Sequence, residues 1–379
     1  KKVFLRVDFN VPIKKGKILD TYRIDKTIPT LQYLLDQGAK VVLASHLGRP
    51  DGKVDPELSL QPVAQYLTET YNLEVLFLEE PDSDMPHHLF LGLKKNQVIL
   101  LNNLRFHQGE QGQDKNLAHQ WASYIDIYVN EGFSISHRKD TSVYLLPQII
   151  EDRCIGFQFR KEIEVLDQIR FKKSQRPFFV CLGGSKVRDK ILILEHLIDQ
   201  TDEFFIGGMI AFTFLKVKGH LVGDSFVSQE HLLKVEEFIN RLEQRNKKLW
   251  LPIDHKVIQK GRIKDTKDID IPNGCKGFDI GTKTQKLFKE QLQRASSIFW
   301  NGPMGLFEKE EFSQGTHQVA EALAENEKAY CVIGGGHSAL AARKYEDQID
   351  HISTGGGASL CYLKGTPLPG LESILVNTT

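Results

Sequence analysis

Short apolar runs alternate with amphipathic stretches along most of the chain. In the first part, the runs that predict strands are 3–7, 39–45, 97–104 and 126–133. In the second part they are 176–184, 202–209, 248–254, 296–305, 329–336 and 350–357. Stretches between them, such as 29–38 and 315–326, have the spacing of helices. Buried strands that alternate with helices are typical of βαβ units, so the pattern predicts parallel sheets in an α/β fold.

The segment 156–171 stands between the two sets of strands. Phe159, Ile163 and Leu166 recur in it at helical intervals, which predicts a connecting helix. A chain of 379 residues is long for one core and favours two domains. We therefore place an N-terminal domain at 1–156 and a C-terminal domain at 157–362, leaving a tail at 363–379.

Charge and cysteine content narrow the classes of function. Lys plus Arg and Asp plus Glu both number 49, so no basic excess favours a nucleic-acid or membrane partner. The five cysteines form no C-x-x-C pair, which favours buried thiols in a reducing compartment over zinc or disulfides. No run approaches the roughly 18 apolar residues of a membrane span. We expect a cytoplasmic protein.

Glycines cluster after the strands of the second part. They are Gly183-Gly184, Gly207-Gly208, Gly302, Gly334 to Gly336 and Gly355 to Gly357. Each turn alone is explained equally well by a tight loop, but ligands bind beyond the carboxyl ends of parallel strands. Several such turns along one edge would form a floor for a polyanion, most simply a nucleotide. Lys186 and Lys190 share a helix face beside the first turn and suit its phosphates.

Basic side chains follow the strands of the first part instead. The basic candidates are Arg23, His46, Arg49, Arg105, His137 and Arg138, and Asp8 and Asn10 accompany them. Taken singly, each is explained as a surface arginine or a satisfied core histidine. As a set they indicate a site for a small, multiply charged anion, because arginine binds carboxylate and phosphate with two hydrogen bonds. Two unlike anion sites suggest a two-domain kinase that closes over its substrates.

Motifs over nearly the whole chain resemble one family. RVDFNVP (6–12), SHLGRP (45–50), GGSKVRDKI (183–191), WNGPMGLFE (300–308) and STGGGASL (353–360) occur in the order found in phosphoglycerate kinases. The resemblance implies reversible phosphoryl transfer between 1,3-bisphosphoglycerate and ADP, giving 3-phosphoglycerate and ATP, with Mg²⁺. It also implies a monomer of two Rossmann-like domains joined by a helix hinge, with a C-terminal tail that returns to the first domain.

On matching positions, the resemblance implies three groups of site residues. The catalytic residues would be Arg23, Lys186 and Lys190. The residues that hold 3-phosphoglycerate would be Asp8, Asn10, Arg23, His46, Arg49, Arg105 and Arg138. The nucleotide site would comprise Gly184, Lys190, Gly208, Gly281, Asn301, Pro303, Glu308, Gly335, Gly336, His337 and Ser338. Within this group, Glu308 would bind the ribose hydroxyls.

The sequence departs from the family at His337, which stands where the resemblance predicts a metal-binding aspartate. Imidazole suits Mn²⁺ or Zn²⁺ better than Mg²⁺, so Mn²⁺ could be preferred. Three hypotheses explain His337. The change is tolerated, or the protonated imidazole binds the nucleotide phosphate. Alternatively, it marks a weakly active or inactive nucleotide-binding relative with a regulatory role. A nicotinamide-dependent dehydrogenase is a distant third hypothesis, based on the loose G-x-G-x-x-A match of Gly334, Gly336 and Ala339.

Overall fold

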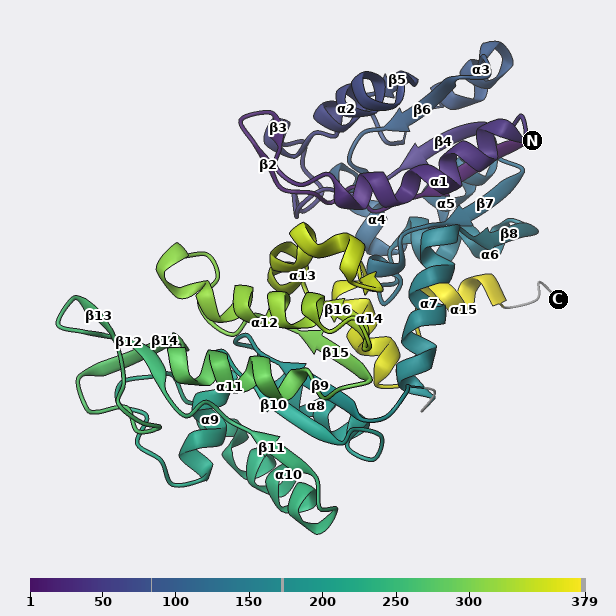
Figure 1. The fold of residues 1–379 in the computed structure, drawn as a ribbon. Helices are drawn as coiled ribbons and strands as arrows, with labels where there is room; N and C mark the ends of the chain where they lie inside the picture. The colour runs from purple at the N-terminus through teal and green to yellow at the C-terminus, as the bar shows by residue number, and fades with distance from the viewer. Residues whose placement is uncertain (83, 172–173, 376–379) are drawn as a thin grey trace. The chain divides into compact units, whose positions relative to one another are not determined.

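Two compact units make up the chain in the computed structural model, which describes residues 1–82, 84–171 and 174–375. One unit comprises residues 1–164 together with the segment from 366 onward, and the other comprises residues 165–365 (Figure 1). Each unit is built around a sheet of six parallel strands. Two Rossmann-like α/β units were the fold expected from the sequence.

The sheet of the first unit has the strand order β5-β6-β4-β1-β7-β8. Its strands are β1 (Lys2–Arg6), β4 (Lys40–Ala44), β5 (Glu74–Leu78), β6 (Gln97–Leu101), β7 (Ile127–Asn130) and β8 (Asp152–Ile155). The four central strands are those predicted from apolar runs. The edge strands β5 and β8 were not predicted, because none of their residues is fully buried and their apolar pattern is weaker.

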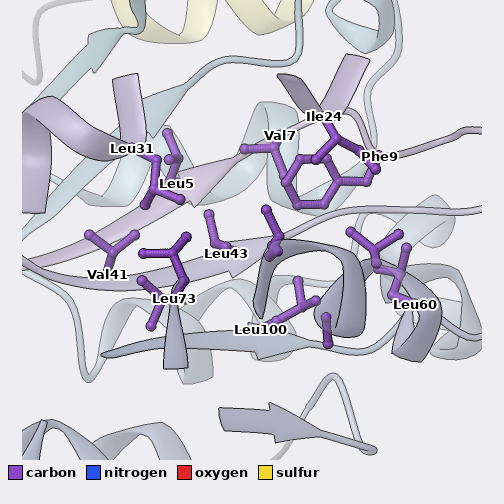
Figure 2. Close-up of a cluster of buried hydrophobic side chains, with 14 of the residues drawn as sticks. Leu5, Val7, Phe9, Ile24, Leu31, Val41, Leu43, Leu60, Leu73 and Leu100 are labelled. Atoms are coloured by element: carbon purple, nitrogen blue, oxygen red, sulfur yellow. The ribbon is translucent and has the colours of Figure 1, made fainter. Parts of the chain in front are cut away.

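Both faces of this sheet are buried, which explains the continuous apolar runs. Val3 and Leu5 of β1 pack into one core with Leu31 of α1 (Tyr22–Asp36), and Figure 2 shows part of this core. Phe4, between them, faces the opposite core with Trp121. Alternate side chains of one strand thus fill two layers.

Helices and one hairpin complete the first unit. The further helices are α2 (Gln61–Tyr71), α3 (Met85–Gly92), α4 (Gln108–Gly112), α5 (Lys115–Ala122) and α6 (Leu146–Ile149), and the hairpin is β2 (Ile13–Lys14) with β3 (Lys17–Ile18). The C-terminal helix α15 (Pro369–Leu375) also packs here. The Gly370 N–H donates to the Ser136 carbonyl at 2.8 Å, and Ser373 Oγ donates to the Val143 carbonyl at 3.2 Å. The tail therefore returns to the first unit.

The helix α7 (Phe157–Arg170) carries the chain from the first unit into the second. A buried carboxylate caps its first turn. Glu131 accepts hydrogen bonds from the main-chain N–H groups of Gln158 and Phe159, both at 3.2 Å, and from the Thr30 hydroxyl. These bonds satisfy N–H groups that a helix start leaves without partners.

The sheet of the second unit has the order β11-β10-β9-β15-β16-β17. Its strands are β9 (Phe178–Leu182), β10 (Glu203–Ile206), β11 (Lys248–Trp250), β15 (Ser297–Asn301), β16 (Tyr330–Gly334) and β17 (His351–Ile352), all within predicted runs. The helices are α8 (Val187–Leu197), α9 (Ile210–Val217), α10 (Leu232–Gln244), α11 (Thr282–Leu292), α12 (Gln314–Glu325), α13 (Gly336–Ala342) and α14 (Gly356–Leu363).

A small antiparallel sheet in the second unit was not predicted. It pairs β12 (His255–Gln259) with β13 (Arg262–Asp265) and β14 (Cys275–Ile280). All four residues of β13 are exposed, so this strand lacks the apolar run by which the others were found. Only parallel sheets were expected, and this one corrects that expectation locally.

Candidate active site

In the first unit, the acidic side chain of Asp8 holds one arginine of the predicted anion-binding cluster in place. Arg23, at the start of α1, donates through Nη1 to Asp8 Oδ2 at 2.6 Å, and the Ser134 hydroxyl donates to the same oxygen. Arg23 Nη1 also lies 3.4 Å from the Asn10 carbonyl. The loop after β1 therefore holds Arg23 in place while leaving its side chain 29% exposed to a ligand.

The loops after β4 and β6 add His46 and Arg105. Arg105 donates to the Gly48 carbonyl at 2.8 Å and lies 3.3 Å from Asp140. The Gly48 N–H donates in turn to Asn10 Oδ1 at 3.0 Å. Three loops that end parallel strands are thus connected at one edge of the sheet, where ligands of this fold class bind.

The electrostatics of this cluster favour an anion. Burial raises the pKa of the Asp8 carboxyl, but the Arg23 guanidinium brings it below its usual value, and hydrogen bonds from Ser134 and Asn10 act in the same direction. Burial also lowers the pKa of Arg138, and the neighbouring guanidinium groups of Arg105 and Arg49 lower it further. These cations repel one another, so an anion bound among them would stabilise their charged forms.

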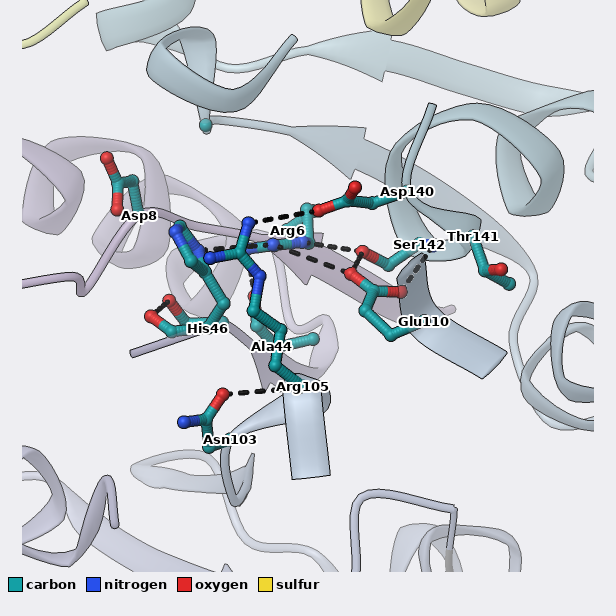
Figure 3. Close-up of polar contacts among 12 residues, drawn as sticks. Arg6, Asp8, Ala44, His46, Asn103, Arg105, Glu110, Asp140, Thr141 and Ser142 are labelled. Carbon is teal, nitrogen blue, oxygen red and sulfur yellow. Dashed lines mark hydrogen bonds and ion pairs between the residues drawn. The ribbon is translucent and has the colours of Figure 1, made fainter. Parts of the chain in front are cut away.

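A second, fully buried pair lies behind these residues and was missed by sequence reasoning. Arg6 and Glu110 have no solvent exposure, and their charged groups are 3.8 Å apart. Figure 3 shows the contacts that run from Glu110 through Ser142 and Arg6 to His46. Arg6 belongs to the RVDFNVP motif, but inside an apolar strand nothing in the pattern set it apart.

The second unit contains a cavity of about 680 Å³ beyond its strand ends. Most residues predicted for the nucleotide and the phosphoryl group line it. They are Gly184, Lys186, Lys190, Asn301, Pro303, Glu308, Gly335, Gly336 and His337. The volume is that of a small-molecule site.

Main-chain contacts form the floor of this cavity. The Gly184 N–H donates to the Pro303 carbonyl at 2.8 Å, and the Gly208 N–H donates to the Met304 carbonyl at 2.8 Å. A Cβ atom at Gly183 would lie 2.1 Å from the Pro303 oxygen, so only glycine permits this approach. Gly335, with φ of +89°, turns the chain from β16 into α13.

Lys190 is almost fully buried at the cavity wall. Its Nζ donates to the Asn301 carbonyl at 2.9 Å and to the Asn301 side-chain oxygen. Burial lowers the pKa of Lys190 to about 7, Asp189 opposes the shift and Lys186 adds to it. The Asn301 amide nitrogen is buried and has no hydrogen-bond partner among the described residues. A phosphate bound beside Lys190 would favour its ammonium form.

His337 contacts two residues of the GLFE segment. Its Nδ1 lies 3.6 Å from Glu308 Oε1, and its ring lies 5.5 Å from the Phe307 ring. The side chains of His337 and Glu308 are 43% and 57% exposed, so a ligand can reach both. An aspartate in place of His337 would instead place a second carboxylate near that of Glu308.

Three predicted residues do not line the cavity. Ser338 Oγ is buried and accepts from the Gly302 N–H at 3.1 Å. Gly208 belongs to the floor behind it, and Gly281 caps α11 against Asp254. The cavity also has lining residues that were not among the predicted site residues. They are mainly apolar, namely Met209, Phe212, Phe226, Lys276, Gly277, Phe278, Leu306 and Leu360.

Two six-stranded parallel sheets, one with a basic cluster and one with a cavity beyond its strand ends, define a Rossmann-like α/β protein. Comparison with known proteins identifies the family. The sequence profile described as phosphoglycerate kinase matches residues 1–366. The chain is 48% identical over 380 residues to the phosphoglycerate kinase of Bdellovibrio bacteriovorus, covering 98% of this chain and 94% of that protein. The chain belongs to the phosphoglycerate kinase family and is an enzyme of the kinase class.

Other relatives agree across the full length. The phosphoglycerate kinase of Thermosipho africanus is 43% identical, with 99% of this chain and 95% of that protein covered. The solved structure of phosphoglycerate kinase from Coxiella burnetii has a TM-score of 0.83 at 35% identity, covering 100% of this chain and 97% of that one. The Pyrococcus horikoshii enzyme gives 0.86 at 32% identity, covering 100% and 96%. Membership in this family disfavours the dehydrogenase hypothesis.

Proposed function

We propose that this chain catalyses the reversible transfer of a phosphoryl group between 1,3-bisphosphoglycerate and ADP, giving 3-phosphoglycerate and ATP. The main support is that a member of this family combines two unlike sites for anions. An arginine and histidine cluster occupies the strand ends of the first unit, and a cavity with two lysines occupies those of the second. The relatives described above carry the name phosphoglycerate kinase, which disfavours an inactive regulatory role.

In this proposal the first unit binds 3-phosphoglycerate. Asp8, Asn10, His46, Arg49, Arg105 and Arg138 hold the substrate, and Arg23 faces the carboxylate that receives the phosphoryl group. Arg23 is suited to this role because Asp8 fixes one of its nitrogens at 2.6 Å while part of the side chain remains exposed. A guanidinium held in this way binds an oxyanion without losing further conformational freedom.

The second unit binds the nucleotide, and its lysines stabilise the phosphoryl group in transfer. Lys186 precedes α8 and Lys190 lies one turn inside it, and both residues line the same cavity. The carboxylate acceptor is already a nucleophile, so the reaction needs no general base. Catalysis then consists of positioning and of neutralising charge on the moving group.

A divalent metal would enter with the nucleotide. The described residues include no cluster of three His, Cys, Asp or Glu side chains placed for a metal ion. The carboxylates that line the cavity are Asp189 and Glu308, with the His337 ring beside the latter. This donor set fits an ion held mainly by phosphates and water, as Mg²⁺ commonly is. Such an ion would neutralise phosphate charge, with Mn²⁺ as an alternative better suited to His337.

The remaining parts of the proposal concern the whole enzyme. We propose a cytoplasmic monomer whose two units close over the bound substrates through the α7 hinge, because transfer requires substrates held on different units to meet. No helix among the described residues is long and apolar enough to cross a bilayer.

A coupled assay tests the proposal. The purified chain should turn over ATP and 3-phosphoglycerate with Mg²⁺ or Mn²⁺, and Lys190→Met should lower kcat at least a hundredfold while the protein stays folded. Absence of turnover at saturating substrates with either metal would contradict the proposal. Restoration by His337→Asp in that case would support the inactive-relative alternative.

A further inference from the structure

The buried pair Arg6 and Glu110 is not used by the chemistry proposed above. Both side chains are fully inside the first unit, directly behind His46. Ser142, also fully buried, contacts both members of the pair. A buried charged pair is weak evidence for stability, since well-packed apolar residues often serve as well. The pair therefore invites a functional explanation.

The hydrogen bonds of Arg6 assign a role to one nitrogen of His46. Arginine carries five N–H groups and has no acceptor. The acceptors that surround the guanidinium are Ser142 Oγ at 2.7 Å, the carbonyls of Val7 and Ala44, Glu110 Oε1 at 3.8 Å and His46 Nδ1 at 3.5 Å. His46 Nδ1 faces a group that can only donate. This nitrogen must offer a lone pair, so the ring hydrogen lies on Nε2.

Glu110 fixes the direction of this chain of hydrogen bonds. Its carboxylate accepts from the Ser142 hydroxyl at 2.6 Å and from the Ser142 N–H at 2.9 Å. The hydroxyl hydrogen is thereby used, so the Ser142 oxygen accepts from Arg6 Nε. With Nε engaged, the orientation of the guanidinium toward His46 is set (Figure 3).

The charged groups around His46 point the same way. Burial lowers the pKa of His46 well below its ordinary value, Asp8 opposes this shift, and Arg6, Arg105 and Arg23 add to it. The ring is therefore neutral at physiological pH. A neutral imidazole binds an anion only through an N–H donor, so the tautomer decides whether His46 can contribute.

We propose that Arg6 and Glu110 are positioning residues that hold His46 as the Nε2–H tautomer, so that this N–H donates to the anionic substrate of the first unit. The identity of that anion as 3-phosphoglycerate rests on the proposed function. The tautomer itself does not.

Nitrogen NMR of the full chain tests the tautomer directly. In protein labelled with ¹⁵N-histidine, with His46 assigned by its loss in His46→Gln, we expect Nε2 protonated and Nδ1 unprotonated from pH 7 to 8. A hydrogen on Nδ1, or an imidazolium ring in this range, would overturn the proposal. The readout requires no turnover, so it is independent of a failed kinase assay.

Two replacements of His46 test which nitrogen serves the substrate. The amide nitrogen of glutamine reaches the position of Nε2, whereas that of asparagine reaches the position of Nδ1. We expect His46→Gln to keep the KM for 3-phosphoglycerate within about threefold, and His46→Asn to raise it roughly tenfold, the effect of one lost hydrogen bond to an anion. The KM for ATP should stay unchanged in both. Equal losses, or a better asparagine variant, would refute the assignment.

A double variant separates positioning from stability. Arg6→Met combined with Glu110→Leu removes the pair without leaving an unpaired buried charge. We expect part of the His46 population to move its hydrogen to Nδ1, with a roughly fivefold higher KM for 3-phosphoglycerate and an unchanged KM for ATP. A purely structural pair would shift the melting temperature alone, which would overturn the proposal. If this variant does not fold, the NMR spectra and the comparison of His46→Gln with His46→Asn still test the proposal.

Discussion

At the scale of single residues, we propose that His337 influences the metal requirement of this enzyme. Its Nδ1 lies beside Glu308 at the mouth of the cavity, so it offers nitrogen where Mg²⁺ prefers oxygen. We expect Mn²⁺ to support turnover at least as well as Mg²⁺ in the natural chain. His337→Asp should lower the Mg²⁺ concentration for half-maximal activity roughly fivefold.

The asparagine variant is the matched control for this metal prediction. His337→Asn removes the imidazole without adding a carboxylate, so it should leave the Mg²⁺ requirement close to that of the natural chain. The Mg²⁺ requirement of the natural chain and of both variants is measured by following kcat at saturating substrates as the Mg²⁺ concentration is raised. Equal responses of the aspartate and asparagine variants would show that the residue does not contact the metal.

Lys190 should take up a proton when the nucleotide binds. Burial lowers its pKa to about 7, so at pH 8 much of the free enzyme holds it neutral. A bound phosphate raises the pKa again because it favours the ammonium form. Calorimetry of ADP binding in buffers with different ionisation enthalpies should reveal uptake of up to about one proton.

Arginine variants provide the controls for this proton uptake. Lys190→Arg should abolish the uptake, because arginine stays protonated at any working pH. Lys186→Arg, a change of the lysine one helical turn earlier, should retain the proton uptake. An identical buffer dependence in the natural chain and in Lys190→Arg would assign the proton to another group.

At the scale of elements, the start of α7 depends on one buried carboxylate. Burial raises the pKa of Glu131 to about 7, against the hydrogen bonds from Thr30, Phe159 and Gln158. A raised pKa contributes stability that is present below the unfolded value and is lost as pH rises through the folded one. From pH 5 to 8, the first unit should lose up to roughly 3 kcal/mol through this group.

Denaturant unfolding followed by Trp121 fluorescence measures this loss in a chain that carries Trp250→Phe and Trp300→Phe, since Trp121 is then its one tryptophan. Glu131→Gln cannot ionise, so its unfolding free energy should fall less over the same pH range. Glu164→Gln, an exposed residue of the same helix, should behave like the natural chain. A slope that Glu131→Gln leaves unchanged would exclude Glu131 as its source.

The elements also show how far sequence reasoning reaches in this molecule. Strands such as β1 and β9, buried on both faces, appear as continuous apolar runs, and each of the ten predicted runs overlaps a strand of the two parallel sheets. The wall formed by Gly277 and Phe278 was missed because it comes from β14, which pairs with β12 in the small antiparallel sheet that was not predicted. Gly281 was assigned to the nucleotide site by the resemblance alone. It follows β14, outside the parallel sheet, and precedes α11, so its place in that site stays a prediction.

The buried pair was missed for a different physical reason. Arg6 is polar inside an apolar strand, and Glu110 lies in a short helix far along the chain. Spacing along a sequence reports which face a side chain occupies, but it does not report which distant residue neutralises its charge. Only the folded unit shows that the two lie 3.8 Å apart.

At the scale of the whole molecule, each ligand should stabilise its own unit. The candidate residues for 3-phosphoglycerate all lie in residues 1–164, and those that line the cavity all lie in residues 165–365. Binding to the folded form slows local opening near the ligand. In hydrogen exchange, 3-phosphoglycerate should protect residues 6–10 and 45–49, whereas ADP should protect 183–190 and 334–338.

Peptide-resolved mass spectrometry of the full chain measures this exchange with each ligand alone. Residues 262–265, in the exposed strand β13, serve as an internal control that neither ligand should change. Protection of the second unit by 3-phosphoglycerate alone would contradict the separate assignment of the sites.

The floor of the nucleotide cavity has a consequence for inhibition. Its shape comes from main-chain contacts of Gly183, Gly184 and Gly208 with Pro303 and Met304, and not from exchangeable side chains. A residue larger than glycine at 183 would collide with the Pro303 carbonyl and disturb the folding of the site. A compound that fits this floor by shape would therefore leave the organism few resistance mutations there that preserve the enzyme.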